Sequence, residues 1–155
     1  MRPRWRPLYC RLSLWRANPI PDGDRIAALA KLVDAAKAPM IVVGGGAVEA
    51  GPEVLALAEK IGAPVVAFRM GKGVVDSRHS LSLTTVAGFR LWDSTDLLIG
   101  IGSRLELPLA RWAPSPAGLK VGRIDIDPAE HRRLTVDLPI VADAADGALA
   151  LAAAV

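Results

Sequence analysis

The feature that most constrains this chain is a short apolar run that leads directly into three glycines. The run is Pro39-Met40-Ile41-Val42-Val43, and Gly44, Gly45 and Gly46 follow it ahead of a helix-like segment. Residues without a Cβ let the backbone turn tightly, and they let a phosphate or another chain segment approach the backbone N–H groups. The pattern predicts a buried strand that ends in a tight turn suited to a nucleotide-like ligand.

The same unit of buried strand, turn and helix recurs along the chain. Continuous apolar strands that alternate with helices favour a parallel sheet, because a strand covered on both faces loses its polar alternation. We therefore expect a three-layer α/β/α, Rossmann-like domain with a mainly parallel sheet of five or six strands. The clearest strand patterns cover residues 40–43, 64–68, 97–102, 121–126 and 140–142.

Cap and stop residues mark the expected helices. Asp22 or Asp24 is placed to cap a helix whose apolar residues recur at helical spacing from Ile26 onward. Gly51-Pro52-Glu53 opens a second helix, and Gly62 ends it. Asp143 precedes a final alanine-rich helix.

Composition predicts one soluble domain. The chain has 155 residues, 52% of them hydrophobic, which suffices for a single core. No apolar stretch approaches the roughly 18 residues that a membrane span requires, so we expect no membrane partner. The single cysteine, Cys10, can form no internal disulfide, which favours a reducing, cytoplasmic compartment.

The positive charge is concentrated at the N-terminus. Five of the 19 basic residues are arginines that precede the first acid, Asp22, so 14 basic residues face 16 acidic ones in the remainder, about −2. Clustered arginines with Trp5 and Trp15 between them could contact nucleic acid or anionic lipid. Because the body has no matching basic stripe, we favour no nucleic-acid partner and interpret residues 1–21 as a basic tail and linker.

Three groups of residues are candidates for binding. The Gly44–Gly46 turn is not the G-x-G-x-x-G fingerprint, and close packing of a strand on a helix would also explain it. Gly102-Ser103-Arg104 combines backbone donors with a side chain suited to phosphate or carboxylate, although Arg104 could equally form a local surface pair. Asp125 ends a strand where a carboxylate can accept from ribose hydroxyls, whereas Asp127-Pro128 also fits a turn and helix cap.

No catalytic centre is evident in the sequence. His79 and His131 are too far apart for a metal-ligand motif, and no nucleophile elbow, Walker motif or paired-carboxylate signature is present. The strand at 64–68 is followed by Arg69 and lacks the acid that holds ribose in a conventional NAD site. Ordinary dehydrogenase chemistry is therefore disfavoured.

The order of these motifs resembles the central domain of thiamine diphosphate-dependent enzymes of the acetolactate synthase, pyruvate oxidase and benzoylformate decarboxylase superfamily. The resemblance covers about residues 22–155, which we interpret as the domain, and any one motif alone is weak. The matching segments are 39–47, 58–66, Gly71-Lys72-Gly73, 96–104 and 124–130.

The resemblance implies that thiamine diphosphate and Mg²⁺ belong to the parent enzyme and not to this chain alone. In that family the flanking domains supply the activating glutamate and the Gly-Asp-Gly…Asn signature that holds Mg²⁺ and the diphosphate. The related string here, Asp22-Gly23-Asp24, lacks the strand and the downstream asparagine. The tail could be the exit linker of a preceding pyrimidine-binding domain.

In some family members the central domain holds the ADP half of FAD, and in others ADP or nothing. The resemblance would place Gly44, Gly45 and Gly46 near the phosphates, Gly102 and Arg104 at the cofactor, and Asp125 at the adenosine end. Two segments depart from the FAD-binding pattern: residues 83–86 replace a His-Gly pair, and residues 105–107 replace an Asp-Asp-Arg continuation.

The leading hypothesis is a cofactor-cradling and assembly domain of a 2-keto acid lyase or synthase, inactive by itself. Its implied partners are the flanking thiamine-binding domains and further copies of itself. Two rival hypotheses stay open. One is a stand-alone module that binds ADP, FAD or NAD, and the other is a purely structural oligomerisation domain.

Overall fold

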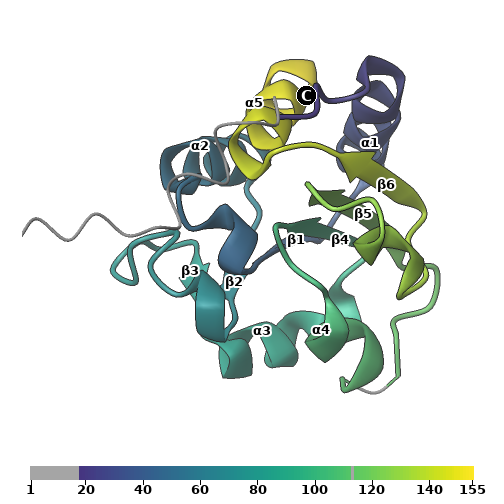
Figure 1. Ribbon diagram of the computed structural model, residues 1–155. Helices are drawn as coiled ribbons and strands as arrows, with labels where there is room; N and C mark the ends of the chain where they lie inside the picture. Colours follow the sequence, from purple (N-terminus) through teal and green to yellow (C-terminus); the bar gives the residue numbers. More distant parts are fainter. Residues whose placement is uncertain (1–17, 113) are drawn as a thin grey trace, which may run out of the picture.

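A six-stranded parallel sheet organises the molecule (Figure 1). The computed structural model describes residues 18–112 and 114–155. All five strand pairs are parallel, in the order β3-β2-β1-β4-β5-β6, which confirms the expected parallel sheet. The strands are β1 Pro39–Val43, β2 Val65–Ala67, β3 Ser82–Leu83, β4 Leu97–Ile101, β5 Lys120–Asp125 and β6 Leu138–Val141.

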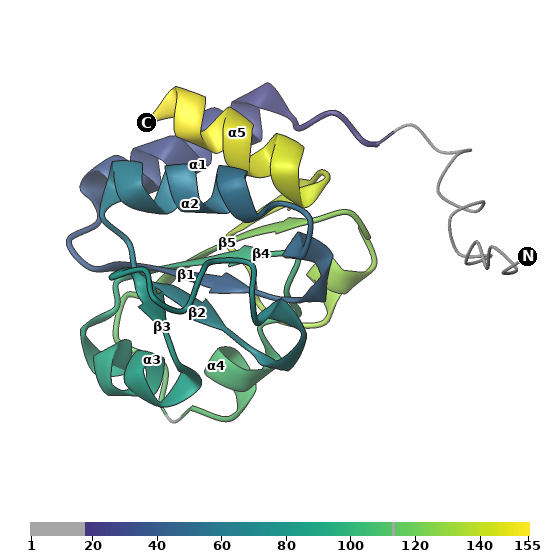
Figure 2. The same cartoon turned by 90° about the vertical axis from the view of Figure 1, so that its left-hand side faces the viewer.

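Helices cover both faces of this sheet, so the fold is the expected three-layer α/β/α arrangement (Figure 2). The longer helices α1, α2 and α5 lie on one face, and the short helices α3 and α4 lie on the other. Their bounds are α1 Gly23–Ala35, α2 Gly51–Ile61, α3 Thr85–Leu91, α4 Glu106–Ala110 and α5 Ala144–Ala154.

The central strands are apolar throughout because each contributes to two cores. Ile41 and Val43 of β1 pack in the core beneath α1, α2 and α5, whereas Met40 and Val42 pack in the opposite core with Trp92. These four side chains have at most 1% of their surface exposed. Burial on both faces explains the absence of polar alternation in this run.

The predicted helix boundaries are confirmed by their caps. Asp22 Oδ1 accepts from the amides of Asp24 and Arg25 at the start of α1, and Asp143 Oδ1 accepts from the Ala145 amide at the start of α5. Gly62 ends α2 with φ +65°, a left-handed conformation that glycine adopts without steric cost.

The sequence pattern did not single out β3, α3 or α4. β3 has only two residues, both half-buried, and its place is decided by pairing with β2 across 17 residues of chain, as in Val65 beside Ser82. Periodicity needs a longer run to be visible.

The basic tail up to Arg16 and Cys10 lie outside the described residues, and no described helix combines the length and apolarity needed to cross a membrane.

Replacing Leu29 with alanine tests the larger core. The Leu29 side chain is fully buried and fills the space over Gly122, where any Cβ would meet it. We expect Leu29→Ala to lower the free energy of unfolding by about 2–5 kcal/mol, because it leaves a cavity. Leu149→Ala, at a half-exposed position of α5, should change it by less than about 0.5 kcal/mol. Urea denaturation measures both, and equal effects would contradict this packing.

Candidate functional site

A cleft of about 1020 Å³ lies at the carboxyl edge of the sheet. Gly44 and its neighbours follow β1, Gly102 and its neighbours follow β4, and Asp125 ends β5. Neighbouring parallel strands end at the same edge, so these segments meet although they are about 60 and 20 residues apart in sequence. The cleft is lined by all seven residues that the sequence singled out: Gly44, Gly45, Gly46, Gly102, Ser103, Arg104 and Asp125.

The turns after β1 and β4 are in direct backbone contact, which we call the glycine junction (Gly44, Gly46 and Gly102). A Cβ on Gly44 would overlap the Gly102 carbonyl oxygen, and one on Gly102 would lie 2.5 Å from the Gly46 carbonyl carbon. Gly102 also has φ +54°, in the left-handed region. Only glycine fits this junction without displacing the backbone.

The amides of the glycine junction already have partners. Gly44 N–H donates to Ile101 O (3.2 Å), Gly46 N–H to Gly102 O (3.1 Å) and Gly102 N–H to Ile124 O (2.9 Å). These three N–H groups are therefore engaged within the protein. The structure supports the alternative that the glycines permit close packing, and their contact with a ligand stays a prediction.

The loop after β4 presents Arg104 to the cleft and buries the residues on either side of it. Ser103 is buried and its Oγ accepts from the Leu105 amide at 3.3 Å. Leu105 is buried too, with φ +56°, and its side chain occupies the space over Gly100. These two anchors leave Arg104, whose side chain is 61% exposed, directed outward.

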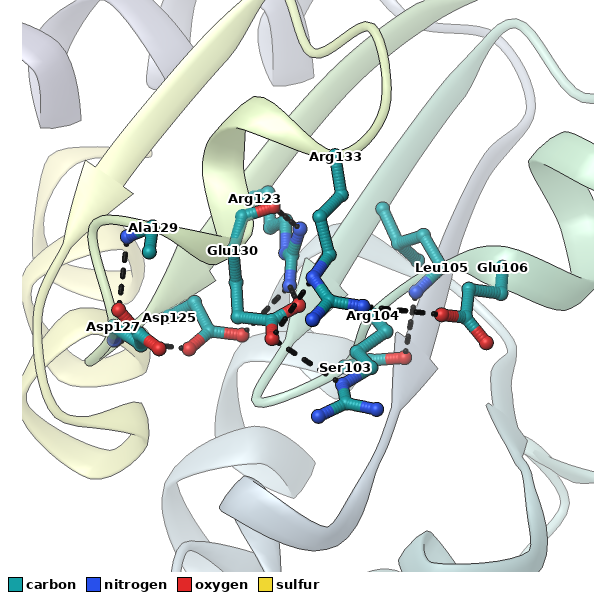
Figure 3. A network of polar contacts seen from close by, with 10 residues as sticks. All are labelled: Ser103, Arg104, Leu105, Glu106, Arg123, Asp125, Asp127, Ala129, Glu130 and Arg133. Atoms are coloured by element: carbon teal, nitrogen blue, oxygen red, sulfur yellow. Dashed lines mark hydrogen bonds and ion pairs between the residues drawn. The ribbon is translucent and has the colours of Figure 1, made fainter.

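Asp125 is engaged within the protein (Figure 3). Its Oδ2 accepts from Arg123 Nη2 at 3.0 Å, and its Oδ1 accepts from the Asp127 amide at 3.1 Å. Asp127 in turn accepts from the Ala129 amide at 2.8 Å, which agrees with the turn-and-cap interpretation of Asp127-Pro128. Binding of adenosine by Asp125 stays a prediction.

Glu130 is the centre of the charged network beside the cleft (Figure 3). Its Oε1 lies 3.4 Å from Arg104 Nε and 3.2 Å from Arg133 Nε, and its Oε2 lies 3.6 Å from Arg123 Nη2. The Arg123 side chain is completely buried, and its Nη1 donates to the Glu130 carbonyl oxygen. Arg133 also faces Glu106 at 3.9 Å.

Sequence reasoning missed several lining residues. Arg69 follows β2 and Asp143 follows β6, so the same rule about strand ends could have found both. Glu106, Arg111 and Glu130 come from α4, the residue after it and a short helical turn, and no local pattern marks them.

The cleft combines three chemical surfaces. Arg69, Arg104 and Arg111 offer guanidinium groups that suit phosphate or carboxylate. Acidic side chains lie on the β5 side, and Phe68, Met70, Leu107 and Ile126 add apolar surface. This arrangement suits a ligand with an anionic part, an uncharged polar part and a flat or apolar part.

His131 follows Glu130, its ring nitrogens are buried, and Arg123 and Asp125 are its charged neighbours. Burial lowers the pKa of His131 below its usual range, and the Arg123 guanidinium lowers it further, whereas the Asp125 carboxylate acts in the opposite direction. The imidazole is therefore neutral at pH 7.

Fold and cleft together define a Rossmann-like domain with a cleft at the carboxyl ends of its strands. Over residues 26–151 the chain matches the family described as "Thiamine pyrophosphate enzyme, central domain". The chain belongs to this family, which confirms the resemblance noted from its motifs.

Curated relatives are acetolactate synthase subunits. The chain is 37% identical over 151 residues to a probable acetolactate synthase large subunit of Methanococcus aeolicus, covering 89% of this chain and 25% of that protein. It is 35% identical over 143 residues to the acetolactate synthase large subunit of Corynebacterium glutamicum, covering 84% and 22%. The chain thus spans about a quarter of the length of these relatives.

Solved structures share the fold. Benzoylformate decarboxylase from Polynucleobacter necessarius superposes with a TM-score of 0.76 at 19% identity, covering 90% of this chain and 28% of that one. A thiamine diphosphate-dependent 4-hydroxybenzoylformate decarboxylase from Rhodococcus jostii gives 0.71 at 21% identity, covering 89% and 28%.

The structure offers no cluster of metal-ligating side chains in the part of the chain that it describes. No group of three or more His, Cys, Asp or Glu side chains in residues 18–112 and 114–155 is arranged to hold a metal ion. We therefore assign no step of thiamine chemistry to these residues.

Replacing Gly102 with alanine tests the glycine junction. Gly102→Ala combines a left-handed backbone with overlap against Gly46, whereas Gly62→Ala has a similar φ and no described heavy atom within 4 Å of its Cβ. We expect about 1–2 kcal/mol of destabilisation for Gly62→Ala and roughly 1–3 kcal/mol more for Gly102→Ala, measured by urea denaturation. Equal losses would show that the turns do not touch.

His131 should make stability depend on pH. Its pKa is lower in the folded protein than the value of about 6.5 in an unfolded chain. The contribution of neutral His131 to the free energy of unfolding is therefore complete above about pH 6.5. It is lost as the pH falls toward the folded-state pKa, because the unfolded chain binds the proton first. His131→Gln should reduce this slope in urea denaturation between pH 7.5 and 5. An NMR titration that places the His131 pKa at or above 6.5 would contradict the prediction.

Proposed function

We propose that this chain is the cofactor-cradling and assembly domain of a thiamine diphosphate- and Mg²⁺-dependent 2-keto acid lyase or synthase of the acetolactate synthase type. The observation that carries the proposal is the family match over residues 26–151 in a chain one quarter as long as its relatives. Other domains of the parent enzyme then hold thiamine diphosphate and Mg²⁺. The chain alone is catalytically silent and functions in the cytoplasm.

We further propose that the cleft binds the ADP portion of a nucleotide, as FAD or as ADP. Its volume of about 1020 Å³ is at the upper end of the usual range for small-molecule pockets. The guanidinium groups of Arg69, Arg104 and Arg111 support a site for the phosphates. Gly45, Ser103 and Asp125 line the same cleft and would bound the ligand.

A structural role in oligomers is the second candidate. Val86 and Phe89 of α3 are exposed by 66% and 51%. Leu91, at the end of the same helix, is exposed as well, and all three lie on the face of the sheet that the short helices α3 and α4 cover. Exposed apolar side chains that gather on one element favour association with another surface. Flanking domains and a second copy of the chain are the partners that this proposal predicts.

Calorimetric titration of the chain with FAD, ADP, and thiamine diphosphate plus Mg²⁺ tests the proposal. We expect FAD or ADP to bind and thiamine diphosphate not to bind. Arg104→Ala should weaken nucleotide binding by about tenfold or more, because it removes a charge-assisted contact to phosphate. Lys31→Ala, an exposed change on α1 away from the cleft, should leave the affinity unchanged.

The outcomes separate the hypotheses. Nucleotide binding that is weakened by Arg104→Ala supports the cleft as the binding site. Turnover of a 2-keto acid by the chain alone would overturn the proposal that it is catalytically inactive by itself. No binding of FAD or ADP to a folded sample would overturn the nucleotide site. Concentration-dependent sedimentation would then favour the structural role.

A further inference from the structure

Arg104 is held by Glu130 through one nitrogen only. The pair joins Arg104 Nε to Glu130 Oε1 at 3.4 Å. Figure 3 shows the two terminal nitrogens of Arg104 directed away from Glu130 and the rest of the network. A guanidinium is planar and its five donors form a rigid fork, so fixing Nε also fixes the direction of both Nη groups.

Glu130 itself is anchored to the sheet. The Arg123 side chain is completely buried on β5, its Nη1 donates to the Glu130 carbonyl oxygen, and its Nη2 lies 3.6 Å from Glu130 Oε2. Only 12% of the Glu130 side chain is exposed. The Glu130 carboxylate is therefore a largely buried anion at the rim of the cleft, and its ion pairs connect the sheet to the exposed Arg104.

We propose that Glu130 is the positioning residue for Arg104. It orients the Arg104 fork so that Nη1 and Nη2 together contact one phosphate group of the ligand. The ligand contact rests on the nucleotide site proposed above, whereas the orientation of Arg104 by Glu130 does not.

The competing explanation is that Glu130 only neutralises charge. Arg104, Arg123 and Arg133 face three acids, Asp125, Glu130 and Glu106, so these six side chains together are formally neutral. If charge balance were all that mattered, removing any one of these acids would make the cleft more positive and would tighten binding of an anion. Positioning predicts the opposite sign for Glu130.

The decisive comparison is Glu130→Gln against Glu106→Gln, each titrated with ADP. Both variants remove one negative charge from the lining of the cleft, but only Glu130 contacts Arg104. We expect Glu130→Gln to weaken ADP binding by roughly fivefold or more and Glu106→Gln to leave it equal or tighter. Tighter binding in both variants would overturn the positioning role.

If Glu130 acts by positioning Arg104, its effect on ADP binding should disappear when Arg104 is absent. In an Arg104→Ala background, Glu130→Gln should change ADP affinity by less than about twofold. Arg104→Lys keeps the charge and leaves the Glu130–Arg123 contact in place, but it loses the fork, so it should weaken ADP binding nearly as much as Arg104→Ala. Wild-type affinity in Arg104→Lys would overturn the proposal even if Glu130→Gln fails to fold.

A measurement without nucleotide separates this proposal from the nucleotide site. Hydrogen exchange of the Arg104 Nε–H can be followed by NMR without nucleotide and assigned by its loss in Arg104→Lys. It should become several-fold faster in Glu130→Gln but not in Glu106→Gln. Unchanged exchange overturns the positioning role, whereas failure of the native chain to bind ADP overturns only the nucleotide site.

Discussion

The carboxyl edge of the sheet depends on one close backbone contact, in which the turn after β1 lies directly against the turn after β4. Gly44, Gly46 and Gly102 make this approach possible because no Cβ stands between the two segments. Gly46 donates to Gly102 across this contact, whereas Gly44 donates to Ile101 at the end of β4 and Gly102 donates to Ile124 of β5. The base of the cleft is therefore packed backbone, and in the proposed function the groups that distinguish a ligand come chiefly from side chains at its rim.

The charged side chains around Glu130 are largely partnered with one another. Arg123 is buried within β5, and a buried guanidinium is tolerated because Asp125 and the Glu130 carbonyl accept its hydrogen bonds. Arg104, at the outer end of the network, retains donors that point away from it. In the proposed site, the contribution of Arg104 to anion recognition would therefore depend on the donor atoms that its pair with Glu130 leaves unengaged.

Local patterns predicted the central part of the fold well. The apolar runs of β1 and β4 and the caps at Asp22, Gly62 and Asp143 are local signals, and the structure has each of them. Elements such as β3 were invisible, because a two-residue strand is defined by its neighbour and not by its own residues. Family membership followed from the order of five weak motifs, which together identify what none identifies alone.

The sequence by itself determined the layers, the parallel strands, the family and the seven residues that gather at one edge of the sheet. It could do so because the burial pattern of a strand, the cap of a helix and the end of a strand each depend on a few consecutive residues. Only the tertiary structure decided what those residues contact: that the amides of Gly44, Gly46 and Gly102 are occupied, that Asp125 pairs with Arg123, and that Arg104 pairs with Glu130. These contacts join segments distant along the chain, and their geometry arises only when the strands pack side by side.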